Sequence, residues 1–530
     1  MHNTNKSKMG RITTTPPRSP FTSPKPLLLS SSSPQTPTHP SPPSDPPPPS
    51  LPTLRPSPLA DSLSRLLITH HNPFHASESP LQLLGLSLPT QTLTQTLLRL
   101  RHSSKIALAF FTWSRDHLRL PPDPDAYDLI VDSLGRVRQF DAAWTLIADM
   151  DRRGLPPSPR TFHVLIRRLV AAGMTRQAVR AFDDMETFIE RPPTKAEFTR
   201  LLDTLCKYRH VRLAMELFNA RRSVFEPDVK AYTVVIYGWC KIGRFDFAEK
   251  LFEEMLARGL EPSVVTYNVL LNGICRNSKL HPSSVFDRTV GRVDDVFVRM
   301  RDRGVQPDVT SYSIVLNLYS RAHKAELTLS KLNSMRDDGI SPNVAMYTLV
   351  VKCLCSCGRL DEAEGLLEEM VVNGVRPMAV THNCFFKAYG GRDDHESALK
   401  LYRMVRDGDG VDAHSYNVLV GLFLRLGCGD AVGEVWADMV EKGMGPDLDS
   451  YTVMVHGLCE RRKWREACRF FVEMIERGFL PQKVTFETLY RGLIQSGLLR
   501  TWWRLKRRLE EESMTFGAEF EEYHLKPYRR

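Results

Sequence analysis

The chain has 530 residues, a formal net charge of +10 at pH 7 and ten cysteines. Its length fits either several globular domains or one long array of repeats. The sequence contains no apolar run long enough to cross a membrane, so we expect a soluble protein.

The cysteines show no spacing typical of a disulfide framework or a zinc site. Cys353, Cys355 and Cys357 occupy alternate positions of one predicted helix, which spreads their thiols around the helix instead of directing them at one metal. Five cysteines recur at one point of a helical pattern, as small buried apolar residues do: Cys206, Cys240, Cys275, Cys355 and Cys459. We therefore expect no bound metal and no cofactor.

Residues 1–60 differ in composition from the rest of the chain. They hold 17 of the 37 prolines, six Lys or Arg and a single acid, Asp45, and they cannot form a packed core. A hydroxyl-rich, acid-poor segment with scattered bases is typical of an organelle transit peptide, and a plain disordered tail is the alternative. Without this segment the net charge falls from +10 to +5, so bulk charge alone points only weakly to a polyanion partner.

Residues 61–123 are predicted to form a helical cap or a degenerate repeat. Apolar residues such as Leu93, Leu97, Phe110 and Phe111 recur at helical intervals there. We expect a hairpin of two helices over residues 89–123.

From residue 124 onward, an aromatic residue followed by a small polar residue recurs about every 35 residues. Tyr232-Thr233, Tyr267-Asn268 and Tyr312-Ser313 are examples. With the aromatic at place four, the units run 124–158, 159–194, 195–228, 229–263, 264–308, 309–343, 344–378, 379–412, 413–447 and 448–482. An eleventh, less regular unit begins at Lys483.

Each unit has the pattern of two amphipathic helices joined by a turn. In unit 229–263, apolar residues follow a helical period on both sides of Gly243, and Gly259 and Pro262 end the second helix. One helix pair cannot bury its apolar face alone, but stacked pairs can. We therefore predict an all-α, right-handed superhelical solenoid of about ten to eleven helix-turn-helix repeats over residues 124–517, followed by a tail, 518–530.

Unit 264–308 has ten residues more than its neighbours, between Arg276 and Val293. Pro282, Ser283 and Ser284 lie in this insertion. We expect a protruding loop within 277–293.

The repeats resemble those of the pentatricopeptide repeat family. Three strings carry the resemblance: Val264-Val265-Thr266-Tyr267-Asn268, Leu251-Phe252-Glu253-Glu254-Met255 and Gly304-Val305-Gln306-Pro307-Asp308. The Trp and Leu-Gly pattern of tetratricopeptide repeats is absent. Units of nearly constant length are similar to the pure class of the family, which is found in plant organelles.

The resemblance implies a protein that binds single-stranded organellar RNA, with one base per unit and the units running from the 5′ end. Such a protein supports transcript processing, stabilisation or intron splicing, with RNA-processing proteins as further partners. We expect a monomer in the mitochondrion, with the chloroplast as the alternative. The His-x-Glu and Cys-x-x-Cys motifs of a deaminase do not appear, and we expect no enzymatic activity. A scaffold for protein interactions is the alternative function.

By this resemblance, each base is read by the residue at place five of the first helix and by the last residue of the unit. The pairs are Asp128 with Ser158, His163 with Thr194, Thr199 with Asp228, Thr233 with Ser263, Asn268 with Asp308, Ser313 with Asn343, Thr348 with Met378, Asn383 with Asp412, Asn417 with Asp447, and Thr452 with Gln482. A carboxylate only accepts hydrogen bonds and suits the ring N–H of U or G, whereas Asn also donates and suits A or C. In the family, Thr or Ser at place five goes with purines and Asn with pyrimidines.

These pairs predict the target n-n-G-R-U-A-R-U-U-R. Here n is unassigned, and each R (a purine) rests on place five alone. The alternative is that Asn, Thr and Asp near a helix start are ordinary caps and turn residues.

Two further sets follow from the resemblance. Val265 and Val380, at place two, match the residues that sandwich each base. At place thirteen a cation recurs in six units and is expected to contact phosphates: Arg136, Lys207, Lys241, Arg276, Arg321 and Arg425. The competing explanation is that a cation stabilises the carboxyl end of a helix through the helix dipole, by about 0.3–1 kcal/mol.

Overall fold

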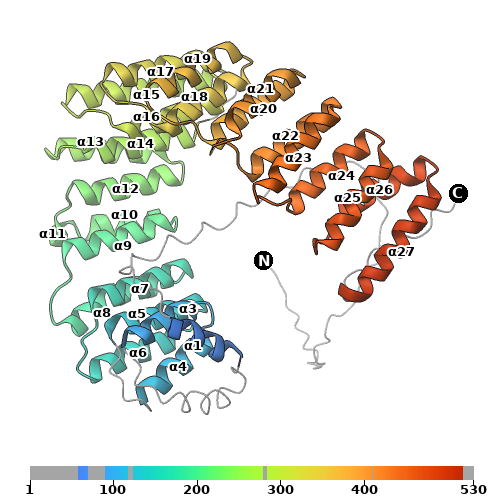
Figure 1. Ribbon diagram of the computed structural model, residues 1–530. Helices are drawn as coiled ribbons and strands as arrows, with labels where there is room; N and C mark the ends of the chain where they lie inside the picture. The colour runs from blue at the N-terminus through green and yellow to red at the C-terminus, as the bar shows by residue number, and fades with distance from the viewer. Residues whose placement is uncertain (1–57, 70–89, 117–122, 279–282, 409, 517–530) are drawn as a thin grey trace, which may run out of the picture. The chain divides into compact units, whose positions relative to one another are not determined.

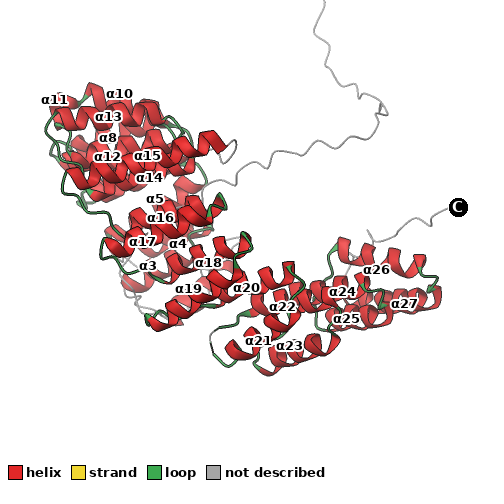
Figure 2. Cartoon of the chain, turned by 90° about the horizontal axis from the view of Figure 1, so that it is seen from above, coloured by secondary structure: helices red, strands yellow, loops and turns green. Residues whose placement is uncertain are grey.

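The structure, a computed structural model, describes residues 58–69, 90–116, 123–278, 283–408 and 410–516. Helices are the only regular secondary structure within these ranges (Figures 1 and 2). The predicted leader up to residue 57 and the predicted tail lie outside the described residues.

From residue 124 onward, each unit contributes a first and a second helix. The first helices are α5 (Pro124–Arg136), α7 (Pro159–Ala171), α9 (Lys195–Lys207), α12 (Val229–Lys241), α14 (Val264–Arg276), α16 (Val309–Arg321), α18 (Val344–Ser356), α20 (Ala379–Gly391), α22 (Ala413–Leu426), α24 (Leu448–Glu460) and α26 (Lys483–Gln495). Every one of them begins at the residue where the sequence places the start of its unit. The predicted repeat period is thereby confirmed.

The second helices follow the same order. They are α6 (Phe140–Arg152), α8 (Thr175–Ile189), α10 (Val211–Ala220) with the short α11 (Arg222–Phe225), α13 (Phe245–Ala257), α15 (Ser283–Asp302), α17 (Ala325–Asp337), α19 (Leu360–Val372), α21 (His395–Val405), α23 (Gly429–Glu441), α25 (Trp464–Glu476) and α27 (Leu499–Phe516). Ahead of the array lie α1 (Pro58–Thr69), α3 (Thr90–Arg99) and α4 (Ser104–Asp116). Helices α3 and α4 contact each other, and both pack on α5.

Stacking joins the units into a solenoid. Each first helix packs against its own second helix and against the first helix of the next unit, from α5 through to α26 (Figure 1). The first helices therefore form one continuous layer, and the all-α solenoid of paired helices is confirmed. The buried surface is shared between neighbours, as expected for helix pairs that cannot bury their apolar face alone.

The aromatic residue at place four ties the two helices of a unit together. It is fully buried, and in four units its hydroxyl donates a hydrogen bond to a carboxylate 22 residues later, in the second helix. These pairs are Tyr232 with Glu254, Tyr347 with Glu369, Tyr416 with Asp438 and Tyr451 with Glu473, at 2.8–3.0 Å. The tyrosine thus fills the core while its hydroxyl keeps a polar partner.

The predicted protruding loop in unit 264–308 is wrong for most of its length. Helix α15 spans 20 residues, seven more than the 13 of α17, and residues 283–289 of the insertion extend it at its N-terminus. Phe286 and Val293 are buried, so the extension continues the apolar face of the helix. Residues 279–282 lie outside the described residues.

Four of the five cysteines at place twelve are buried as predicted, and Cys355 is half-buried. The small side chain allows close approach of the next first helix, because a Cβ added to Gly238 would lie 2.5 Å from Cys206 Sγ. Gly273 faces Cys240 in the same way. Among the described residues, no group of three or more His, Cys, Asp or Glu could hold a metal ion, and no helix is long and apolar enough to span a bilayer.

Gly273→Ala should lower the midpoint of urea denaturation, because the new Cβ would lie 2.7 Å from Cys240 Cβ. Overpacking of this kind costs about 1–3 kcal/mol. Gly365→Ala is the matched control, since its Cβ would meet nothing within 4 Å in α19, and alanine is favoured over glycine in a helix by about 1 kcal/mol. A rise in the midpoint for both variants would contradict the close helix approach.

Candidate nucleic-acid interface

The last residue of each unit is the N-cap of the next first helix. In eight of the ten units its side chain accepts a hydrogen bond from the third N–H of that helix, in keeping with the capping alternative: Ser158, Thr194, Asp228, Ser263, Asp308, Asn343, Asp412 and Asp447. Met378 and Gln482 make no such bond. All ten residues therefore occupy equivalent positions at the N-terminal ends of stacked helices.

The residue at place five lies beside the last residue of its own unit. Helices α14 and α16 pack side by side, which brings Asn268, one turn into α14, next to Asp308 at the start of α16. Asn268 Nδ2 donates to Asp308 Oδ1 at 3.0 Å. We call the line of fifth-place and last-place side chains the reading row.

Three Asn–Asp pairs of the reading row share this arrangement. Burial opposes ionisation of Asp308, Asp412 and Asp447, but hydrogen bonds from a serine of the next helix and from the fifth-place asparagine outweigh it. The pKa of each carboxyl is therefore held below its ordinary value. At neutral pH these side chains are anions that only accept hydrogen bonds.

Two fifth-place asparagines keep an acceptor without a partner. Asn383 is 5% exposed and Asn417 is half-buried, and within the described part of the chain the Oδ1 atom of each accepts no hydrogen bond. A buried polar atom left unpaired costs about 1–3 kcal/mol. Both sites therefore favour a ligand that brings a hydrogen-bond donor.

The threonines at place five are oriented by their own helix. Each donates its hydroxyl to the main-chain carbonyl four residues earlier, at 2.7–2.8 Å: Thr199, Thr233, Thr348 and Thr452. The hydroxyls of Thr233 and Thr348 also lie 2.8 Å from those of Thr266 and Thr381 in the next unit.

Sequence reasoning missed the residue at place three, which orients the reading row. Thr266 and Thr381 contact fifth-place threonines, while Ser311 Oγ lies 2.6 Å from Asn268 Oδ1 and 3.0 Å from Asp308 Oδ1. The available signal was the recurrence of Ser or Thr at this place, for example at Ser415 and Ser450.

The first two units differ from the rest. Asp128 is buried, and this burial raises its pKa to about 6 although Arg160 lies 3.4 Å away. His163 is half-buried, and burial followed by repulsion from Arg167 and Arg200 lowers its pKa to about 4. His163 is thus neutral at physiological pH.

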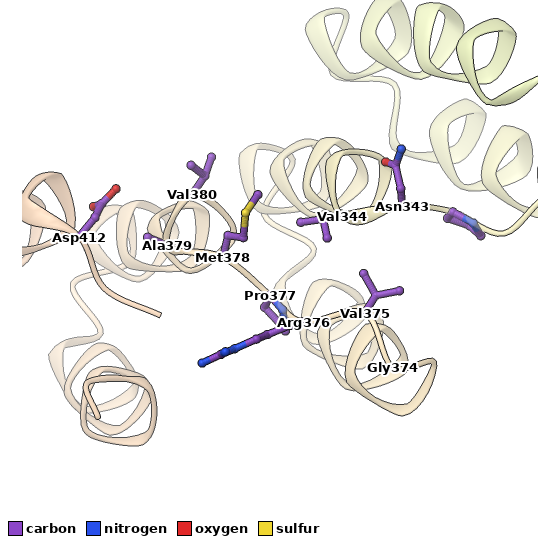
Figure 3. Close-up of a pocket in the computed structure, with 11 residues that line it drawn as sticks. Asn343, Val344, Gly374, Val375, Arg376, Pro377, Met378, Ala379, Val380 and Asp412 are labelled. Carbon is purple, nitrogen blue, oxygen red and sulfur yellow. The ribbon is translucent and has the colours of Figure 1, made fainter. Parts of the chain in front are cut away.

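A hollow of about 860 Å³ interrupts the reading row where unit 344–378 ends. The last residues of three successive units, Asn343, Met378 and Asp412, line it together with Val380. Figure 3 shows Met378, Val380 and Asp412 projecting to the same side of the helices. Because Met378 is exposed and offers no strong hydrogen-bonding group, this unit presents apolar surface where eight of the other nine units present a side-chain cap.

The valines at place two are exposed to solvent, at 62% for Val265 and 58% for Val380. Val484 holds the same place in the eleventh unit and is 62% exposed. In the first two units this place instead holds an ion pair, with Arg160 Nη1 2.7 Å from Asp125 Oδ1.

Four of the six cations at place thirteen are engaged within the protein. Arg136 and Lys207 form ion pairs with an acid one turn earlier in their own helix. Lys241 and Arg425 donate to a main-chain carbonyl at the end of the preceding first helix, at 2.6 and 2.7 Å. The last two contacts are those that the helix-end explanation requires.

Arg276 and Arg321 are the exceptions. Both are exposed, and neither forms an ion pair with any residue that the structure describes. Of the six cations they have the most freedom to meet an external anion.

Sequence comparisons agree with this architecture. Profiles of the PPR repeat family match residues 227–276, 411–460 and 450–495, and PPR repeat profiles match residues 338–371 and 160–188. The mitochondrial pentatricopeptide repeat-containing protein At2g13420 of Arabidopsis thaliana is 56% identical over 482 residues, which cover 91% of this chain and 94% of the relative. A putative pentatricopeptide repeat-containing protein of the same plant, At5g65820, is 31% identical over 38% of this chain and 32% of its own length.

Solved structures of similar fold have low sequence identity. Maize pentatricopeptide repeat protein PPR10 is 19% identical, covers 87% of this chain and 79% of its own, and has a TM-score of 0.35. Yeast Rmd9p, solved in complex with a 16-nucleotide target RNA, is 11% identical, covers 86% of this chain and 96% of its own, and has a TM-score of 0.40.

The stacked helix pairs define a helical-repeat solenoid protein. On the extent of the match to the Arabidopsis relative, the chain belongs to the pentatricopeptide repeat family. The name of that relative agrees with the predicted mitochondrial location.

Asp128→Asn should stabilise the protein more at pH 7.5 than at pH 5. The pKa of Asp128 is about 6, above the ordinary 3.8. The protonated carboxyl therefore stabilises the folded state below pH 4, and this stabilisation is lost as the pH rises through 6. Asparagine does not ionise, and the variant should gain up to about 3 kcal/mol over the unsubstituted protein across this window. Urea denaturation at both pH values measures the difference.

Asp447→Asn is the control. The pKa of Asp447 lies below its ordinary value, so the Asp447 carboxyl group stays ionised between pH 5 and 7.5. Its effect on the denaturation midpoint should be the same at both pH values. A pH-independent effect of Asp128→Asn as well would show that Asp128 is not protonated near pH 6.

Proposed function

We propose that this protein binds single-stranded RNA in the mitochondrion through the reading row and holds a transcript segment for processing, stabilisation or intron splicing. Residues 1–60 serve as the transit peptide in this proposal. The observation that carries it is the line of equivalent polar side chains at the N-terminal ends of stacked helices. Such a line suits unpaired bases, whose edges are open to side chains.

The Asn–Asp pairs supply the most specific support. The carboxylates of Asp308, Asp412 and Asp447 accept hydrogen bonds only, and the unpartnered carbonyls of Asn383 and Asn417 also call for a donor. The N3–H of uracil is such a donor. We therefore keep U at the fifth, eighth and ninth places of the target n-n-G-R-U-A-R-U-U-R.

Exposed valines and free arginines would complete the contacts. Val265 and Val380 present apolar surface beside the reading row, where a base can lose contact with water. Arg276 and Arg321 are placed at the ends of their helices and can meet phosphates. Met378, which lines the hollow, offers no hydrogen bond to discriminate bases, so the seventh letter rests on Thr348 alone.

A gel shift with ten-nucleotide RNAs tests the proposal. RNA with the predicted target should bind more tightly than a scrambled RNA of the same composition in 150 mM salt. Equal affinity for the two RNAs would favour the protein-interaction scaffold.

Asn417→Thr should move the preference at the ninth base from U towards G. Threonine at place five donates to its own helix, as Thr452 does, and leaves Asp447 as the acceptor for the ring N–H of G. Each well-paired base is worth about 1–3 kcal/mol of discrimination, so the swap should change the affinity ratio at this base about tenfold or more. Competition between RNAs that differ only at base nine measures this ratio, and base eight is the internal control.

Arg321→Ala should weaken all RNAs alike and flatten the dependence of affinity on salt. Loss of one phosphate contact lowers the slope of log affinity against log salt by about 0.7 for a single strand. Lys241→Ala is the matched control at the same place, because Lys241 is engaged with the preceding helix and should change the slope less. Fluorescence anisotropy between 50 and 300 mM salt measures both slopes; equal slopes for the two variants would remove Arg321 from the phosphate contacts.

A further inference from the structure

Helix α27 has an inward face that completes the core at the end of the array. The ring of Trp502 lies 5.7 Å from that of Phe486 and 4.6 Å from that of Tyr490, both of α26, and Leu505 is buried. This face holds α27 in place.

The opposite face of α27 carries arginines and an exposed tryptophan. Arg500, Trp503, Arg504 and Arg507 are spaced i, i+3, i+4, i+7 and form one stripe on the helix. All four are exposed, with Trp503 at 61%. Lys506 Nζ lies 5.3 Å from the centre of the Trp503 ring, so the positive charge surrounds an aromatic surface.

The repeat itself does not require a basic stripe. In two earlier second helices the corresponding places are rich in acids, with Asp246, Glu249 and Glu253 in α13, and Asp361, Glu364 and Glu368 in α19. In α8, two of these places hold Arg176 and Arg180. The charge at these places therefore varies from unit to unit, and α27 combines three exposed arginines with an exposed tryptophan there.

The neighbouring second helix extends the positive surface. Helix α25 packs against α27 and has Arg465 and Arg469 at the places that Arg500 and Arg504 hold in α27. Both are exposed, and neither forms an ion pair with a residue in the described ranges. We call Arg465, Arg469, Arg500, Trp503, Arg504 and Arg507 the terminal basic patch.

The chemistry of the patch favours a single-stranded polyanion with flat rings. Guanidinium groups bind phosphates, and an exposed indole stacks on any base at a gain of about 1–3 kcal/mol. A helix that binds a membrane surface needs a broad apolar face. The exposed stripe of α27 offers a single apolar side chain, that of Trp503, and therefore does not favour a membrane surface. A purely acidic protein partner would leave the indole without a planar partner.

We propose that the terminal basic patch is a second RNA-binding site, which takes the sugar-phosphate backbone and one stacked base of the transcript beyond the segment covered by the reading row. This inference rests on the proposed function. Given the order of units proposed above, the bound segment is the 3′ flank of the target. The site binds without regard to sequence, because every base has a face on which indole can stack.

Fluorescence anisotropy with the full chain and three RNAs tests the inference. The RNAs are the ten-nucleotide target alone, the target with ten adenosines at its 3′ end, and the target with ten adenosines at its 5′ end. The 3′ extension should raise affinity about 5- to 100-fold and the 5′ extension should not. Trp503→Ala should abolish the gain while leaving affinity for the short target unchanged, and Trp503→Phe should restore part of it.

Arg500→Ala combined with Arg504→Ala should reduce the gain and its salt dependence. Lys250→Ala is the matched control, because Lys250 is exposed and holds in α13 the place of Arg504. Circular-dichroism melting checks that each variant is folded.

Four outcomes are distinguishable. Failure of the short target to bind sinks the proposed function, whereas a bound short target with no gain from the 3′ extension sinks only this inference. A gain that survives Trp503→Ala and the double arginine substitution also overturns it. Equal competition by polyglutamate and oligoadenylate would overturn it in favour of an acidic protein partner.

Discussion

Each first helix from α7 onward begins directly after the last residue of the preceding unit, which is its N-cap. The first N–H groups of a helix have no partner within the helix, and a cap such as Asp308 satisfies one of them. A good cap stabilises a helix by about 0.5–2 kcal/mol. Here the cap also fixes the residue at which one unit ends and the next begins. The caps lie in line because the first helices are stacked in chain order, and the reading row is a consequence of that stacking.

The first turns of the helices hold the reading row in shape. The hydroxyl of Ser311 lies within hydrogen-bond distance of both Asn268 and Asp308, so the two side chains that would face one base are oriented by a third residue in the next unit. The atoms to which the proposed function assigns base reading are therefore held in place by the protein itself, which in that proposal reduces the entropy cost of binding. The same network explains why Asp308, Asp412 and Asp447 remain ionised in spite of partial burial.

The repeat period predicted the fold well because the same residue types recur at the same places. The tyrosine at place four marks the start of each first helix, and Gly259 with Pro262 marks the end of one second helix. The extension of α15 was missed because Pro282, Ser283 and Ser284 resemble a loop, although Phe286 and Val293 continue the helical period. The engagement of Lys241 with Lys207 depends on the distance between two helices, which a sequence pattern does not contain. The roles of place three were hidden because serine and threonine there also fit an ordinary first turn.

In the proposed function, the last residue of each unit both caps a helix and reads a base, and this double use limits the bases that the array can select. A side chain that both caps a helix and presents hydrogen-bonding atoms to a base must be short and polar, which leaves Asn, Asp, Ser and Thr. Met378 and Gln482 fall outside this set, and at both positions the following helix starts without a side-chain cap. In the proposed function, a substitution that changes base preference at the last place also changes the capping of the next helix. The requirements of helix ends would thus limit the bases that the protein can select.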